Sequence, residues 1–241
     1  MGIEVSATRY VTINDTHQHG VNTLVASNPT RGRKGGISTL HVFKRNYLGG
    51  RDWDDGNPLI HALKDTGSYR ILPFWRTQFD ARARNILTKC LEELQRHDYL
   101  LPTPSSSPFC GRFTTMVSDI SGVPILDSAF LVKKTVGEVL EDIRATPPKL
   151  KRSQQDAFDD ELDQLGRIEP DQTYQTKLVA NNVRTLFHFF KVKGDTPPVS
   201  GQRILVVDDL LATGSSLFSI REILQNRHGA SVSYLSYLSD L

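Results

Sequence analysis

The sequence predicts an α/β fold in which a mostly parallel sheet is flanked by helices. Residues Arg203 to Val207 form a nearly continuous apolar run, which is typical of a strand buried on both faces of a parallel sheet. Strand-like runs also alternate with helical patterns along the chain, and this order is typical of the α/β class.

Length and composition limit the kind of protein. The 241 residues suit one α/β domain with an elaboration, and 38% hydrophobic residues suffice for a sizeable core. The net charge of only +2 predicts no strong field for polyanions. Cys90 and Cys110 form no CxxC pair, so a zinc ribbon is unsupported. We see no apolar signal core and no run of ~18 apolar residues, and therefore expect a cytoplasmic protein with no membrane partner.

The first part of the chain, residues 1–45, is interpreted as a β-rich N-terminal extension that precedes a main domain at residues 46–241. Short alternating segments at Val5 to Thr12 and Thr39 to Lys44 predict edge strands. Asn28 to Gly36 combines turn residues with three basic side chains and predicts a loop.

The clearest helix is expected at Asp80 to Arg96, where apolar residues recur at the spacing of one buried face: Ala83, Ile86, Leu87, Cys90, Leu91 and Leu94. A short buried strand at Tyr99 to Leu101 follows, ended by Pro102. Pro102 to Ser107 then predicts a loop, and Gly111 to Ser121 a short helix.

The middle of the chain predicts short strands at Pro124 to Leu126 and Phe130 to Val132, and a helix at Val136 to Ile143. From Thr146 to Thr173 the composition becomes polar and rich in helix breakers. This stretch is either a solvated excursion or a flexible lid, and we take about 146–178 as a flexible insertion.

The C-terminal part holds the strongest strand–loop–helix pattern. Leu186 to Val192 is aromatic and β-prone, and Arg203 to Val207 is the buried strand. A helical face is expected after it, formed by Leu217, Ile220, Ile223 and Leu224. Val232 to Leu238 alternates and is expected to be the last strand.

The segment RILVVDDLLATGSS, residues 203–216, carries the chemistry. The acidic pair Asp208 and Asp209 stands at the carboxyl end of the predicted strand, where ligands bind in open α/β sheets. The small-residue loop from Ala212 to Ser216 opens a helix, so its free N–H groups favour an anion such as a phosphate. Gly214 allows close approach of the backbone.

Two carboxylates beside a phosphate site would repel the ligand if they touched the phosphate directly. Their contacts are favourable if they face hydroxyl groups, or a Mg²⁺ ion that neutralises a pyrophosphate. A sugar phosphate that carries both hydroxyls and a pyrophosphate satisfies the strand, the acidic pair and the loop together.

The segment resembles the motif with which type I phosphoribosyltransferases bind 5-phosphoribosyl-1-pyrophosphate (PRPP), and every position of that motif matches. The resemblance implies the fold of that family, with a hood or lid insertion. It implies that Asp208 and Asp209 are the catalytic residues, which contact the ribose hydroxyls of PRPP. It also implies that they bind the Mg²⁺ ion. It also implies that the following residues bind the 5′-phosphate: Leu211, Ala212, Thr213, Gly214, Ser215 and Ser216.

Three further segments resemble the ComF-like branch of that family: Leu59 to Lys64, the Pro-x-Pro loop, and Asn182 to Phe187. This resemblance implies pyrophosphate binding by Pro102, Thr103, Pro104 and Ser105, and phosphate binding by Arg184. The cysteine-rich N-terminal zinc module of that branch is absent. Arg112 is either a diphosphate-neutralising residue or an ordinary surface arginine.

Several functions stay open at this point. A receiver domain also has an acidic pair after an apolar strand, but the 32 residues after Asp209 are too few for its further units. The leading interpretation is an enzyme that transfers the phosphoribosyl group of PRPP to a nucleobase or amine. The alternatives are a non-catalytic PRPP-binding regulatory module and a ComF-like accessory protein that handles single-stranded DNA. The resemblance also allows a homodimer.

Overall fold

The computed structural model describes residues 1–46, 57–105, 107–175, 179–194 and 198–239. The chain divides into two compact units, and each is described by itself. The first unit comprises residues 1–127, 202–212 and 231–241, and the second comprises residues 128–201 and 213–230. The proposed division at residue 45 and the proposed insertion at about 146–178 stay predictions.

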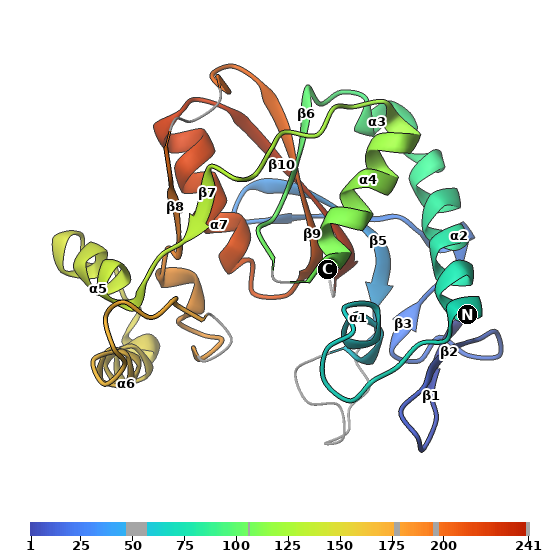
Figure 1. Cartoon of the computed structure of the whole chain (residues 1–241), viewed down its shortest axis with the longest axis horizontal. Coiled ribbons are helices and arrows are strands. Elements are labelled where there is room, and N and C mark those ends of the chain that lie inside the picture. The colour runs from blue at the N-terminus through green and yellow to red at the C-terminus, as the bar shows by residue number, and fades with distance from the viewer. Residues whose placement is uncertain (47–56, 106, 176–178, 195–197, 240–241) are drawn as a thin grey trace. The chain divides into compact units, whose positions relative to one another are not determined.

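The first unit is built on a six-stranded sheet in which β5, β10, β9 and β6 run parallel to one another (Figure 1). The strand order is β3-β5-β10-β9-β6, and β4 also pairs with β5. Their bounds are Val21–Asn22 for β3, Thr30–Lys34 for β4, Ile37–Arg45 for β5, Tyr99–Pro102 for β6, Arg203–Leu211 for β9 and Ser231–Ser239 for β10. The predicted α/β class with a mostly parallel sheet is confirmed.

The N-terminal strands differ from the sequence-based expectation. Thr39 to Lys44 is not an edge strand, because β5 has β10 on one side and β3 and β4 on the other. Val5 to Thr12 is not one strand but spans a turn between β1 (Gly2–Val5) and β2 (Val11–Asn14), which pair antiparallel. The predicted loop at Asn28 to Gly36 contains β4, whose Thr-Arg-Gly-Arg-Lys sequence has no large apolar residue to reveal a strand.

Helices of the first unit cover the sheet beside β9. They are α1 (Pro58–Leu63), α2 (Pro73–Lys89), α3 (Leu91–Leu94) and α4 (Phe109–Ser121), and a 3₁₀ turn η1 spans Val25–Ser27. The helix expected at Asp80 to Arg96 begins earlier, since Pro73 occupies its first turn, and it breaks at Cys90. The strand at Tyr99 and the helix before Ser121 are confirmed, whereas Pro124 to Leu126 makes only a single bridge from Ile125 to Leu100.

Among its described residues, the second unit holds a two-stranded antiparallel sheet, several helices and short 3₁₀ turns. Strand β7 (Leu131–Lys133) pairs with β8 (Phe190–Val192). The helices are α5 (Val136–Ala145), α6 (Gln155–Leu165) and α7 (Ser215–Arg221), which continues as the π-helical segment η5 (Glu222–Arg227). Short 3₁₀ turns are η2 (Arg152–Gln154) and η4 (Arg184–Leu186).

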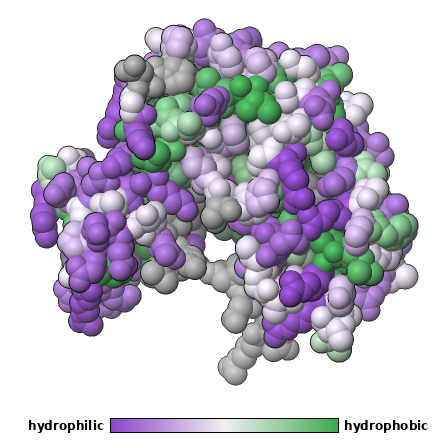
Figure 2. Space-filling view, in the orientation of Figure 1, coloured by the Kyte–Doolittle hydropathy of each residue, from purple (hydrophilic) through white to green (hydrophobic). Residues whose placement is uncertain are grey.

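The polar stretch from Thr146 to Thr173 is partly folded. Helix α6 packs against α5 and buries Phe158 and Leu165, although the outer surface around both helices is mostly hydrophilic (Figures 1 and 2). Composition alone therefore underestimated its structure, because two apolar residues seven positions apart are enough to anchor a helix on one face. Residues 176–178 of the proposed insertion lie outside the described residues.

Candidate functional site

The acidic pair lies within strand β9 and not after it. The ladder between β9 and β10 continues from Asp208 paired with Ser236 to Leu211 paired with Ser239, so the expected strand end at Val207 is wrong. Successive side chains of a strand point to opposite faces of the sheet. The two carboxylates therefore have different neighbours, and their direct link is a 2.9 Å hydrogen bond from the Asp209 N–H to Asp208 Oδ1.

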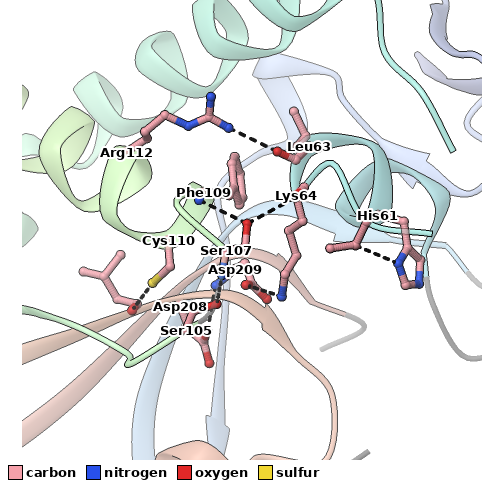
Figure 3. Close-up of polar contacts among 12 residues, drawn as sticks. His61, Leu63, Lys64, Ser105, Ser107, Phe109, Cys110, Arg112, Asp208 and Asp209 are labelled. Atoms are coloured by element: carbon pink, nitrogen blue, oxygen red, sulfur yellow. Dashed lines mark hydrogen bonds and ion pairs between the residues drawn. The ribbon is translucent and has the colours of Figure 1, made fainter. Parts of the chain in front are cut away.

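Asp209 forms an ion pair with Lys64. The Lys64 Nζ lies 2.8 Å from Asp209 Oδ2, and the Asp209 side chain is 9% exposed (Figure 3). Lys64 caps the C-terminal end of α1, a helix that Pro58 starts and the Asn57 side chain caps. The short helix thus points a cation at the strand, and this contact neutralises Asp209 in a largely buried position.

Asp208 lies on the opposite face, where it accepts a hydrogen bond from the hydroxyl of Tyr234 on β10. Both residues are buried. Burial, together with the charge of Asp209, raises the pKa of Asp208 to about 7, and the hydrogen bonds from Tyr234 and from the Asp209 N–H oppose that rise. Asp208 therefore keeps its proton to a higher pH than an ordinary aspartate does.

The Pro-x-Pro loop leaves β6 beside this part of β9. Pro102 pairs with Val207, and the Thr103 N–H donates to the Val207 carbonyl at 2.8 Å. Thr103 is buried, and its Oγ1 has no hydrogen-bond partner among the described residues. A buried hydroxyl without a partner is unusual in a folded protein. The parallel pairing of the two strands thus brings an unsatisfied hydroxyl to the same sheet edge as the acidic pair.

Ser107 links this loop to α1 and α4 by hydrogen bonds. Its hydroxyl donates to the Lys64 carbonyl at 3.4 Å and accepts from the Phe109 N–H at 3.3 Å, while the Ser107 N–H donates to Ser105 Oγ at 3.2 Å (Figure 3). Cys110, the second residue of α4, donates its thiol hydrogen to the Val207 carbonyl at 3.3 Å. We call Lys64, Thr103, Asp208, Asp209 and Tyr234 the aspartate site.

The thiol of Cys110 lies beside the aspartate site but is unreactive. Burial, together with the charges of Asp208 and Asp209, raises the pKa of its thiol well above the usual range. A thiol that stays protonated is a poor nucleophile and a poor metal ligand. The chemistry of the aspartate site therefore rests on oxygen and nitrogen groups.

The small-residue loop follows β9 as predicted, between Leu211 and the start of α7. Leu211 is buried, and the Ala212 carbonyl accepts a 3.3 Å hydrogen bond from Lys34 Nζ. In the second unit, Gly214 has φ of 84° at the N-cap of α7, a conformation that favours glycine. The hydroxyls of Thr213 and Ser215 lie 3.3 Å apart. The motif thus has the strand, the glycine turn and the helix in the predicted chain order.

Arg184 belongs to the second unit. Its guanidinium donates two hydrogen bonds to the Val179 carbonyl, at 3.0 and 2.7 Å. This arginine therefore holds its own loop, and its phosphate-binding role stays a prediction. Arg112 lies in the first unit, where it donates to the Leu63 carbonyl at 3.1 Å (Figure 3).

A magnesium ion fits the aspartate site only as the partner of a substrate. Among the described residues, no group of three or more His, Cys, Asp or Glu side chains could hold a metal. Mg²⁺ is usually bound through one or two carboxylates and the phosphates of its substrate, with several waters retained. Asp209 alone of the two carboxylates lies on the face of Lys64, so it could supply one carboxylate ligand in that way, with the Mg²⁺ ion held mainly by the substrate.

Sequence reasoning missed Lys64 and Tyr234 as members of the site. Lys64 is 145 residues away from Asp209 in the chain, and Tyr234 is 26 residues away from Asp208. The period-two alternation of β10 was the available signal for Tyr234, because a diagonal neighbour on a parallel strand can reach the same face. Lys64 ends the segment that resembles the ComF-like branch, but nothing in the sequence pairs it with Asp209, since that contact is a tertiary feature.

Comparisons with known proteins gave distant similarities. No protein-family model matches the chain, and no curated protein matches it. Among solved structures, the chain is similar to the adenine phosphoribosyltransferase of Leishmania tarentolae, with 11% identity, a TM-score of 0.37, and coverage of 99% of this chain and 95% of that chain. It is also similar to the adenine phosphoribosyltransferase of Leishmania donovani, with 14% identity, a TM-score of 0.33, and coverage of 84% of each chain. Similarities as distant as these give no residue correspondence.

None of the helices in the described part of the chain combines the length and the apolar composition of a membrane span.

Proposed function

We propose that this protein is a phosphoribosyltransferase that binds PRPP with Mg²⁺ and transfers the phosphoribosyl group to a nitrogen acceptor, releasing pyrophosphate. The observation that carries the proposal is the complete motif at residues 203–216, in which an acidic pair in a buried strand is followed by a glycine turn and a helix. The acceptor is proposed to be a nucleobase or another amine.

The aspartate site supplies groups that suit the ribose and pyrophosphate ends of PRPP. Asp209 is proposed to face the ribose hydroxyls and a Mg²⁺ ion, which supplies neutralisation of the leaving pyrophosphate. Lys64 pairs with Asp209 at 2.8 Å and so fixes the position of this carboxylate. The Thr103 hydroxyl is proposed as a donor to the pyrophosphate, because phosphate oxygens accept such bonds.

Such a reaction needs positioning and charge neutralisation more than a protein nucleophile. The thiol of Cys110 is no candidate nucleophile, because its pKa is held high by burial and by the two aspartates. Asp208, whose pKa is raised to about 7 by burial and by Asp209, is proposed to hold Tyr234 and the β9 backbone in place. The proposed 5′-phosphate loop, from Leu211 to Ser216, follows directly in the chain.

The test is release of pyrophosphate from PRPP and Mg²⁺ in the presence of a panel of nucleobases and amines. We expect acceptor-dependent release by the wild-type protein and its loss in Asp208→Asn/Asp209→Asn. Glu92→Gln, a change at an exposed carboxylate on α3, is the matched control and should retain full release. Equal release by the wild-type protein and the double variant would contradict the proposal.

Binding of PRPP without any product would instead support the non-catalytic regulatory module. The Lys64–Asp209 pair favours keeping this second candidate, because the carboxylate proposed to face Mg²⁺ already has a cation as its partner. Binding of single-stranded DNA, a homodimer and membership of the ComF-like branch all stay predictions.

A further inference from the structure

The ion pair between Lys64 and Asp209 leaves both side chains with unused hydrogen-bonding groups. Lys64 Nζ lies 2.8 Å from Asp209 Oδ2, and neither side chain has a further hydrogen bond or ion pair among the described residues. An ammonium group has three N–H donors, and a carboxylate has two acceptor oxygens. Two donors of Lys64 and one oxygen of Asp209 therefore have no protein partner in the described part of the chain.

Both members of the pair keep surface that a ligand can reach. The Lys64 side chain is 24% exposed, and the Asp209 side chain is 9% exposed. Water and salt screen the charges of a fully exposed pair, whereas a pair with no exposed surface could meet no ligand. The Lys64–Asp209 pair lies between these limits, so a charge that arrives or leaves there is weakly screened and has a large effect.

The main chain of Lys64 is fixed, whereas its ammonium group sits on a flexible stem. The Lys64 N–H donates to the Ile60 carbonyl at 3.0 Å, and the Lys64 carbonyl accepts from the Ser107 hydroxyl at 3.4 Å (Figure 3). These contacts hold the end of α1 beside the loop that follows β6. Four carbons separate the ammonium group from this anchored backbone. Lys64 can therefore change its partner by rotation of its side chain, without movement of α1.

Other basic groups near Lys64 have partners of their own. The Arg112 guanidinium donates to a main-chain carbonyl of α1 at 3.1 Å (Figure 3). The His61 ring lies one turn before Lys64 on α1, and its Nδ1 is 3.3 Å from Thr66 Oγ1. Burial and then the charge of Lys64 lower the pKa of His61, while the charge of Asp209 raises it. His61 therefore tends to be neutral, and Lys64 carries the positive charge beside Asp209.

An ammonium group and a divalent cation compete for the same carboxylate. A metal ion beside Asp209 would meet the positive charge of Lys64, which lies 2.8 Å from one of the two carboxylate oxygens. The described residues provide no group of three or more His, Cys, Asp or Glu side chains that could hold a metal independently of this pair. In the free protein, Asp209 is therefore a poor metal ligand. A diphosphate removes this obstacle, because its oxygens accept hydrogen bonds from a lysine ammonium group.

We propose that Lys64 is an exchangeable cation that pairs with Asp209 in the free protein and moves to the diphosphate of a bound ligand. Asp209 is then free to bind the divalent cation that accompanies the diphosphate. Metal and diphosphate therefore bind together, and each tightens the other by the same factor, because coupling between two ligands is reciprocal. The inference rests on the proposed function only in taking a diphosphate as the ligand. It gives Lys64 a ligand-binding role in addition to its pairing with Asp209.

Mn²⁺ alone is the probe for the first half of the exchange, and the electron paramagnetic resonance signal of free Mn²⁺ measures its binding to the full-length protein. Lys64→Met should bind Mn²⁺ at least about tenfold more tightly than the wild-type protein, because the competing charge is gone. The gain should be absent in Lys64→Arg, which keeps the charge, and in Lys64→Met/Asp209→Asn, which lacks the carboxylate. Equal Mn²⁺ affinities of the wild-type protein and Lys64→Met would overturn the proposal.

Arg31→Met is the matched control for this titration. It frees the Glu93 carboxylate from an ion pair of the same 2.8 Å length, in which the side chains are 55% and 39% exposed. Because water already screens that pair, its removal should change the Mn²⁺ affinity by less than about twofold. Equal gains in Arg31→Met and Lys64→Met would show that any freed carboxylate has this effect, and would overturn the proposal.

The wild-type protein provides a second measurement, which does not depend on the folding of Lys64→Met. The protein is labelled with ¹³C-lysine, and the ε-methylene signal of Lys64 is assigned by its absence in Lys64→Arg. We expect a saturable shift of this signal when Mg²⁺ and pyrophosphate are added together. Mg²⁺ alone should leave it unchanged, because Lys64 leaves Asp209 only for the anion. No shift with both present, or the same shift with Mg²⁺ alone, would overturn the proposal.

Failure of this inference can be told apart from failure of the proposed function, because the probes Mn²⁺ and pyrophosphate include neither ribose nor acceptor. Exchange at Lys64 without release of pyrophosphate from PRPP would support the inference and contradict the transferase. Release of pyrophosphate with none of the expected changes at Lys64 would support the transferase and overturn the exchange.

Discussion

The two faces of the sheet at β9 surround adjacent carboxylates in opposite ways. Asp209 faces a cation, Lys64, at 2.8 Å, whereas Asp208 accepts hydrogen bonds from the hydroxyl of Tyr234 and from the N–H of Asp209. Burial and the charge of Asp209 raise the pKa of Asp208 to about 7. One Asp-Asp dipeptide thus places one carboxylate beside a cation and the other in a buried position that disfavours its charge.

The largest effect is expected from Asp208→Asn, through the pH dependence of stability. The folded protein holds the Asp208 proton up to about pH 7, while the unfolded chain releases it near ~3.9. Between these values the folded state binds more protons, so wild-type stability falls as pH rises from about 4 to about 7. The variant lacks this group, so its stability should fall less than that of the wild-type protein over this pH range.

Urea denaturation of both proteins at about pH 4 and about pH 8 measures this difference, which should grow in favour of the variant towards the higher pH. Parallel pH profiles for the two proteins would mean that Asp208 titrates as an ordinary aspartate. The proposed difference between the surroundings of Asp208 and Asp209 would then be wrong.

A smaller loss is expected from Lys64→Met, which removes the cation from Asp209 and keeps most of the side-chain volume. Breaking a fully buried pair costs about 3–5 kcal/mol and breaking an exposed one almost nothing. Because the Lys64 side chain is 24% exposed, we expect a loss of about 2 kcal/mol of unfolding free energy. Adding Asp209→Asn should recover most of it.

Arg31→Met is the matched control for that experiment. The Arg31–Glu93 pair has the same 2.8 Å distance, but its side chains are 55% and 39% exposed. Its removal should change stability by less than about 0.5 kcal/mol. Equal losses in Lys64→Met and Arg31→Met would show that burial does not strengthen the Lys64–Asp209 pair.

A comparable or smaller loss is expected from Tyr234→Phe, and here β10 offers its own control. Tyr234→Phe removes a hydroxyl that donates to Asp208, at an expected loss of about 2 kcal/mol. Tyr237→Phe removes a hydroxyl that has no partner among the described residues, so no loss is expected. Thermal melts of both variants test the difference, and equal stabilities would contradict the hydrogen-bond assignment of Tyr234.

The secondary-structure elements of this site could be predicted from the sequence, whereas its tertiary contacts could not. The buried strand, the glycine turn at Gly214 and the helix after it all follow from short patterns of residue type. The end of β9 was misjudged because the polar residues Asp208 and Asp209 suggested a strand end, while pairing with Ser236 and Leu238 of β10 extends the ladder. Strand β4 was hidden because its residues have no apolar period.

The partners of the two aspartates could not be predicted in the same way. The 145 residues between Lys64 and Asp209 leave no local pattern, and only the packing of α1 against the sheet brings them together. The buried hydroxyls of Thr103 and Tyr237 are similar cases, because whether a hydroxyl has a partner depends on the complete surroundings of its atom.

The most direct test of the central claim is a calorimetric titration of PRPP with Mg²⁺ into the wild-type protein, Asp209→Asn and the control Glu92→Gln. We predict saturable, Mg²⁺-dependent binding to the wild-type protein and to Glu92→Gln, and its loss in Asp209→Asn. Binding that persists unchanged in Asp209→Asn, or no binding to the wild-type protein, would contradict the assignment of the aspartate site to PRPP.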